Sequence, residues 1–178
     1  MIGLAAHGVI AGVHLGERLV ERGSPWVRAL LAGGVLAGIY AIGRAMTDEP
    51  IALASGNNVI EWALEPDHAF GLLVAVFVLR ALGPSVAIVG GLFIPLMAAG
   101  AVVGRMFSDA APGDDDVTLY VIVGAASMLG AGYAVPLTAV VFVAEYTGQA
   151  AAIGPGLLAM AAVRIVVGSR SVSGGQIA

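Results

Sequence analysis

The sequence predicts an all-α, polytopic membrane protein built from short, tilted and re-entrant helices. Hydrophobic residues make up 59% of the chain and charged residues 11%, whereas soluble domains carry about 25% charged residues. The 26 glycines suit close packing of helices in lipid. Several apolar runs are shorter than the roughly 20 residues that a membrane-crossing helix needs. Glycine and proline interrupt them, and such breaks are tolerated at membrane depth only where protein or water surrounds them.

Charge and residue types argue against several other functions. The net charge of −4 argues against a nucleic-acid partner. Cysteine is absent, so the sequence holds no disulfide framework. His7, His14 and His68 show no metal-ligand spacing with carboxylates, and the sequence contains no hydrolase motif. We therefore expect that the protein binds no metal or cofactor and is not an enzyme. The N-terminus has no basic segment or evident cleavage site, and we expect no removable signal peptide.

The first part of the chain predicts two long helices. Residues 2–20 form the first, and a second occupies about residues 25–46. Between them, Ser24 is the expected N-cap and Pro25 the first helical residue. The second helix carries four glycines whose spacing predicts a face that another backbone approaches closely: Gly33, Gly34, Gly38 and Gly43.

A polar stretch and a shorter apolar helix follow. We expect a short helix near 58–65 that lies at a membrane interface, and an apolar helix over 68–82 that the Gly-Pro-Ser triplet at 83–85 breaks. Arg80 lies inside this apolar helix, where a charge facing lipid at the bilayer centre costs about 2.5–3.5 kcal/mol. We therefore expect Arg80 to reach an interface or to pair, for example with Glu145.

The next segment predicts a helix start that can bind an anion. It reads Gly90, Gly91, Leu92, Phe93, Ile94 and Pro95. The two glycines free the backbone, and Pro95 suits a first helical turn because its missing N–H would have no partner there. An uncharged run, 96–104, continues the helix. Unpaired N–H groups at membrane depth need a partner, and the positive end of a helix favours an anion.

The remaining segments predict an acidic loop and three further helices. Residues 105–116 form a loop rich in aspartate. Helices follow near 117–132, 136–147 and 152–167, because glycine and Pro136 divide the long uncharged run. Residues 169–178 form a polar tail, so that 1–178 is a single membrane domain.

Two separated motifs resemble the CLC family of chloride channels and transporters. The helix start at 90–95 is similar to the family's anion-binding motif GxFxP. Segment 133–147 contains Pro136-Leu137-Thr138 and ends in Glu145-Tyr146-Thr147, which is similar to a family segment that reads alanine-proline-leucine-threonine and ends in glutamate, a hydrophobe and threonine. Their order and spacing agree from about residue 2 to residue 168. The resemblance covers only the C-terminal half of the family's membrane domain.

The resemblance implies anion transport, with chloride or a similar anion bound, by a channel or a proton-coupled exchanger. The backbone amides that face the anion in the family map onto Leu92 and Phe93. The whole candidate site comprises Gly91, Leu92, Phe93, Ile94 and Pro95. A tyrosine that contacts the anion in many members maps onto Val172 or a neighbour, so that this ligand is either lost or lies beyond the chain. The resemblance also implies a homodimer, a missing N-terminal CLC half as partner, or both.

An alternative function and an orientation follow from the same resemblance. A truncated or split CLC half could serve as a membrane scaffold or dimerisation module that conducts no ions. We expect an integral protein of the plasma (inner) membrane. The acidic loop at 105–116 would lie outside, whereas Arg164, Arg170 and the C-terminus would be cytoplasmic, as the positive-inside rule predicts.

Overall fold

The computed structural model describes residues 24–53, 56–86, 92–111 and 116–167, together with the single residues 3, 5, 6, 8, 9 and 11. These residues form helices and connecting turns and include no strand, which confirms the all-α fold class. The helices are α2 (Pro25–Thr47), α3 (Gly56–Leu64), α4 (Phe70–Val86), α5 (Phe93–Ala110), α6 (Val117–Tyr133), α7 (Pro136–Thr147), the 3₁₀ turn η1 (Ala150–Ala152) and α8 (Ile153–Val167).

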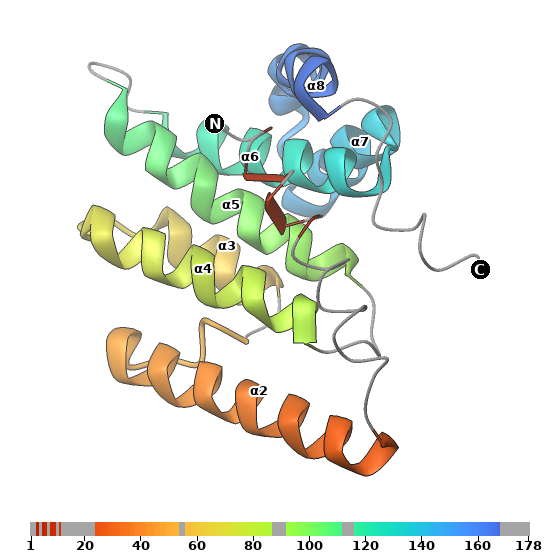
Figure 1. The fold of residues 1–178 in the computed structure, drawn as a ribbon. Helices are drawn as coiled ribbons and strands as arrows, with labels where there is room; N and C mark the ends of the chain where they lie inside the picture. The colour runs from red at the N-terminus through yellow and green to blue at the C-terminus, as the bar shows by residue number, and fades with distance from the viewer. Residues whose placement is uncertain are drawn as a thin grey trace.

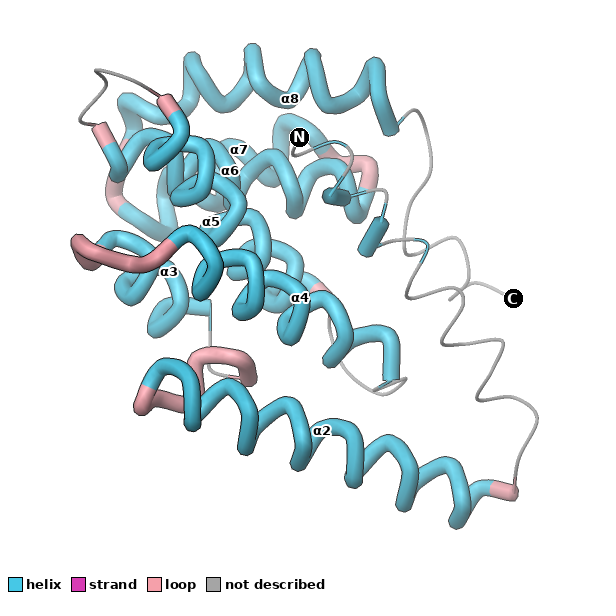
Figure 2. The backbone as a smooth tube through the Cα atoms, turned by 60° about the vertical axis from the view of Figure 1, so that its left-hand side comes forward, coloured by secondary structure: helices cyan, strands magenta, loops and turns pink. Residues whose placement is uncertain are grey.

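The helices are stacked with α5 and α6 at the centre. Figure 1 shows α2 at one edge of the stack and α8 at the opposite edge, and the turned view of Figure 2 keeps this order. Helix α5 contacts α3, α4 and α6, and α6 in turn contacts α7 and α8. The fully buried side chains of Met97, Met128 and Leu129 lie in this central layer. The core therefore surrounds the helix that follows the glycine-rich motif.

The described residues include both long and short apolar helices. Three of these helices are long and apolar enough to cross a membrane, namely Ala29–Thr47, Phe93–Ala110 and Ala150–Val167. Three more are apolar but shorter: Phe70–Gly83, Val117–Tyr133 and Pro136–Thr147. The shorter ones fall below the roughly 20 residues of an ordinary crossing, which favours incomplete spans, because a tilted span would need to be longer. This mixture agrees with the predicted polytopic membrane fold.

Helices α5 and α6 cross each other at glycine residues. A Cβ added at Gly124 would lie 2.7 Å from Gly104 Cα, and one added at Gly100 would lie 2.9 Å from Ala125 Cα. Both distances are shorter than real Cβ contacts allow, so the absence of side chains lets the two backbones approach closely. Such small-residue crossings are typical of helix packing in lipid.

Among the described residues, the close approach predicted for α2 is found at one of its four glycines. A Cβ at Gly33, Gly34 or Gly38 would meet no atom within 4 Å in those ranges, whereas one at Gly43 would collide with Ala52. The physical reason is the position of α2 at the edge of the described helices, where it packs on α4.

Two predicted boundaries are also wrong. Helix α4 continues through 83–85 to Val86, because Pro84 falls in the last turn, where its missing N–H removes a single helical hydrogen bond. Residues 105–110 continue α5 instead of forming a loop. The charge of Arg105 does not end the helix, because its guanidinium donates to the backbone oxygens of Ala63 and Glu65 and pairs with Asp109.

The other predicted helices agree with the structure to within about two residues. Pro25 is the first residue of α2, and Ser24 occupies the N-cap position without a side-chain hydrogen bond. The short helix predicted near 58–65 is α3, whose Val59 and Ala63 are buried. Most of the predicted helix 2–20 and the tail 169–178 lie outside the described residues.

Candidate anion-binding site

The predicted helix start is present at the beginning of α5. Leu92 occupies the N-cap position with φ −82° and ψ −5°, and it is buried. Phe93 is the first helical residue, which places Pro95 in the first turn, as predicted. Leu96 N–H donates the first helical hydrogen bond to Leu92 O, at 3.0 Å. Gly91 belongs to the candidate site but lies outside the described residues.

The first amides of α5 find no backbone acceptor among the described residues. The N–H groups of Leu92, Phe93 and Ile94 donate to no carbonyl in those ranges. The N-cap supplies no side-chain hydrogen bond, and the first turn contains no acidic residue. Donors at a helix N-terminus attract negative charge, because the backbone dipoles add up there. The start of α5 therefore offers donors for which the described part of the chain provides no competing acceptor.

A row of aromatic rings fixes the helix start against the second motif. The rings of Phe93 and Phe142 meet edge to face with centroids 4.9 Å apart, and the Phe93 and Tyr133 centroids are 5.8 Å apart. Phe142 in turn stacks on Tyr146 at 5.7 Å. Such pairs contribute about 0.5–1.5 kcal/mol each beyond the area that they bury. The fold thus brings together the two sequence motifs, 90–95 and 133–147, that are separated in the chain.

Charged residues of the helices find other partners. Arg80 is buried, and its Nη1 donates to Ile51 O at 2.6 Å. Glu145 is exposed on α7, and within the described residues no ion pair joins it to Arg80. The suggested pair is therefore wrong: the guanidinium binds a backbone carbonyl of the α2–α3 connection. A carbonyl at this position removes part of the cost of burying the cation.

Of the three histidines, His68 lies among the described residues. Its Nε2 donates to Trp62 O at 2.6 Å, and its ring stacks on the Trp62 ring at 4.0 Å. Both contacts hold the turn after α3. In the part of the chain that the structure describes, no group of three or more His, Cys, Asp or Glu could hold a metal ion. His7 and His14 are outside that part.

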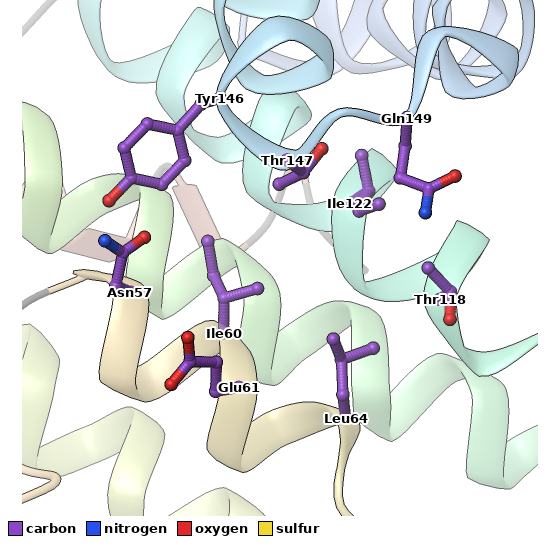
Figure 3. Close-up of a pocket in the computed structure, with 9 residues that line it drawn as sticks. All are labelled: Asn57, Ile60, Glu61, Leu64, Thr118, Ile122, Tyr146, Thr147 and Gln149. Atoms are coloured by element: carbon purple, nitrogen blue, oxygen red, sulfur yellow. The ribbon is translucent and has the colours of Figure 1, made fainter.

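Sequence reasoning missed a buried charged cluster and a polar pocket. Arg105 was assigned to a loop, and only the long-range bonds to Ala63 and Glu65 reveal its place in the core. The pocket lies between α3, α6 and the end of α7 (Figure 3). Its residues come from three distant segments, so no local pattern in the sequence could have identified it.

The long and short apolar helices define a polytopic membrane protein with discontinuous helices. One of them, α5, starts with amides that have no acceptor in the described part of the chain. The sequence model of the family described as "Voltage gated chloride channel" matches residues 1–168, and the chain belongs to this family.

Relatives and a solved structure share parts of this chain. The H(+)/Cl(-) exchange transporter ClcA of Klebsiella pneumoniae (strain 342) is 33% identical over 131 residues, which cover 68% of this chain and 27% of that protein. ClcA of Citrobacter koseri is 32% identical over 131 residues, with the same coverage. The X-ray crystal structure of a slow cyanobacterial Cl⁻/H⁺ antiporter matches 99% of this chain and 44% of its own, with a TM-score of 0.77 and 22% identity. The likeness to this crystal structure shows that the two chains share a fold.

These matches define how much of a relative the chain represents. It spans 27% of the length of the curated relatives named above and 44% of the structural neighbour.

Proposed function

We propose that this chain takes part in the transport of chloride or a similar anion across a membrane, as part of a channel or a proton-coupled exchanger. Family membership and the likeness to exchange transporters support anion transport as the class of function. We further propose that the backbone amides of Leu92 and Phe93 hold the anion, with Gly91, Ile94 and Pro95 setting the backbone around them. The observation that carries this site is the set of amides at the start of α5 that find no acceptor among the described residues.

The energy available from this helix end sets a limit on the site. The positive end of a helix stabilises an anion by about 0.3–1 kcal/mol when exposed and by up to about 2 kcal/mol when partly buried. Each charge-assisted hydrogen bond adds about 1.5–3 kcal/mol. Dehydrating an anion costs far more than either contribution. Further donors must therefore share the anion, and we propose that a second copy of the chain or a separate N-terminal half supplies them.

A membrane scaffold that conducts no ions is the second candidate. One observation favours it: α2 presents large apolar side chains that no described residue covers, among them Trp26 and Leu30. A chain of this kind would hold another subunit through α2, α7 or α8. In both candidates we propose an integral protein of the inner membrane with its C-terminus in the cytoplasm.

Chloride efflux from liposomes separates the two candidates. The purified chain is reconstituted in chloride-loaded liposomes, and chloride release is followed with an ion-selective electrode after valinomycin and a protonophore are added. A transporting chain releases chloride faster than protein-free liposomes do. Efflux at the protein-free level, from protein whose helical content is intact by circular dichroism, supports the scaffold and contradicts transport by the chain alone.

A further inference from the structure

A pocket lies away from the start of α5. It has a volume of about 240 Å³ and lies between α3, α6 and the end of α7 (Figure 3). None of the residues from Leu92 to Pro95 contributes to it. Its lining consists of Asn57, Ile60, Glu61, Leu64, Thr118, Ile122, Tyr146, Thr147 and Gln149.

The pocket is acidic. Glu61 is the charged residue of the lining, and none of the nine residues is basic. Within the described ranges, its carboxylate takes part in no ion pair or hydrogen bond. The neighbouring polar groups are the amides of Asn57 and Gln149 and three hydroxyl groups, which all carry acceptor oxygens. An anion would meet the carboxylate without a cation to offset it, so this site is unsuited to chloride.

An adjoining pocket extends the same acidic character. It shares Thr118, Ile122 and Gln149 with the first pocket and adds Asp116. Asp116 caps α6, with its Oδ1 accepting from Leu119 N–H at 3.0 Å. Its negative charge raises the local attraction for cations, because the potentials of neighbouring charges add.

Three apolar side chains also line the pocket. Ile60 and Leu64 lie on α3, the helix that carries Glu61, and Ile122 faces them from α6, near Thr147 and Gln149 in Figure 3. A bare metal ion would gain nothing from these apolar side chains, and it would find a single carboxylate where hard cations usually find several. An amine with a short hydrocarbon part can contact the carboxylate and the apolar side chains at once.

We propose that this pocket binds a small organic cation, with its ammonium group at Glu61 and its hydrocarbon part against Ile60, Leu64 and Ile122. Each water in the liquid occupies about 30 Å³, so the pocket has room for a molecule of about eight non-hydrogen atoms. Benzylammonium has this size and combines one cation with one apolar ring. The proposal is independent of the anion site, because it concerns other residues and the opposite charge.

Calorimetric titration of benzylammonium into the chain in a non-ionic detergent tests the proposal. Chloride is held at a fixed concentration, and benzyl alcohol serves as the neutral molecule of the same size and shape. We expect saturable binding of benzylammonium that is at least tenfold tighter than binding of benzyl alcohol. The variant E61Q should weaken benzylammonium binding at least fivefold, whereas N57D, which adds a second carboxylate to the lining, should tighten it.

Glu65 provides the matched control for charge. It is exposed, follows Glu61 by four residues and lies outside the pocket lining. E65Q removes the same charge from the same region and should leave the affinity unchanged. Equal losses in E61Q and E65Q, equal affinities for the amine and the alcohol, or no saturable binding by the folded wild-type chain would each overturn the proposal.

Discussion

Arg105 is a buried cation in the centre of the bundle, with 6% of its surface exposed. Its Nη1 donates to Ala63 O at 3.1 Å and also to Glu65 O, at the C-terminal end of α3. Its Nε donates to Asp109 Oδ1 at 2.8 Å, one turn further along α5. The carbonyls at the end of a helix carry partial negative charge, so the guanidinium stabilises α3 and ties it to α5.

We predict that R105M destabilises the chain by about 2–3 kcal/mol, because hydrogen bonds to charged groups contribute about 1.5–3 kcal/mol. Their loss leaves the buried carbonyl of Ala63 and the partly buried carbonyl of Glu65 without the guanidinium. The free energy of unfolding is measured with denaturant in detergent micelles. D109N is the matched control. It removes only a partly exposed ion pair, for which about 0–1 kcal/mol is typical. Equal losses in both variants would show that the two carbonyl contacts contribute little.

The crossing of α5 and α6 depends on residues without side chains. A Cβ at Gly124 meets the α5 backbone, whereas one at Gly33 on α2 meets no described atom within 4 Å. We predict that G124A destabilises the chain by roughly 1–3 kcal/mol, the usual cost of overpacking. G33A should be neutral or stabilising by up to about 1 kcal/mol, because alanine favours helix more than glycine does. Thermal unfolding of both variants in the same detergent compares them; a stable G124A would contradict the close crossing.

Helix caps offer a second comparison between elements. The side chain of Asp116 accepts a hydrogen bond from Leu119 N–H, whereas Ser24 at the start of α2 makes no such bond. D116A should therefore lower the free energy of unfolding by about 0.5–2 kcal/mol. S24A should leave it unchanged. A loss in S24A as large as that in D116A would mean that the serine caps α2 in solution.

The elements show which parts of the fold the sequence determines locally. Helices α6, α7 and α8 were predicted to within about two residues, because glycine and proline mark their ends in an uncharged run. The end of α4 and the continuation of α5 past Arg105 were missed, since both depend on partners far away in the chain. The glycines of α2 resemble those of α5 and α6 in pattern, and only the position of each helix in the bundle decides which are packed.

In the candidate site, too, some features follow from the local sequence and others depend on residues far away in the chain. The helix start at Phe93 and the place of Pro95 follow from local chemistry and were predicted. The contact of Phe93 with Tyr133 and Phe142 was not predicted, although the motifs that carry these rings were identified. The binding of an anion by the Leu92 and Phe93 amides stays a prediction.

At the scale of the whole molecule, the two tryptophans should differ in their access to lipid. Trp26 on α2 is 82% exposed, whereas Trp62 on α3 is 5% exposed. We predict that brominated phospholipids quench the fluorescence of W62F, which retains Trp26, much more than that of W26F, which retains Trp62. Short-range bromine quenching requires contact with the lipid chains. Equal quenching would contradict either the burial of α3 or the position of α2 at the edge.

The exposed faces of α2 and α8 also bear on assembly. Ile165 is 86% exposed and Leu158 is 77% exposed on α8, opposite the side chains that pack on α6. In a membrane protein these faces contact lipid or another subunit. The proposed transport function needs further anion donors, so the assembled protein, not the single chain, is the unit that we expect to move ions.

The central claim is that the Phe93 amide binds an anion, and chloride titration of a backbone variant tests it most directly. An amide-to-ester exchange at Phe93 removes the N–H group but keeps the ring that packs on Phe142. The same exchange at Phe107, within the same helix, serves as the control. We predict that calorimetry shows saturable chloride binding to the wild-type chain and to the Phe107 ester. Binding to the Phe93 ester should be about ten- to a hundredfold weaker, which corresponds to the loss of one charge-assisted hydrogen bond. Unchanged affinity in the Phe93 ester would contradict the account.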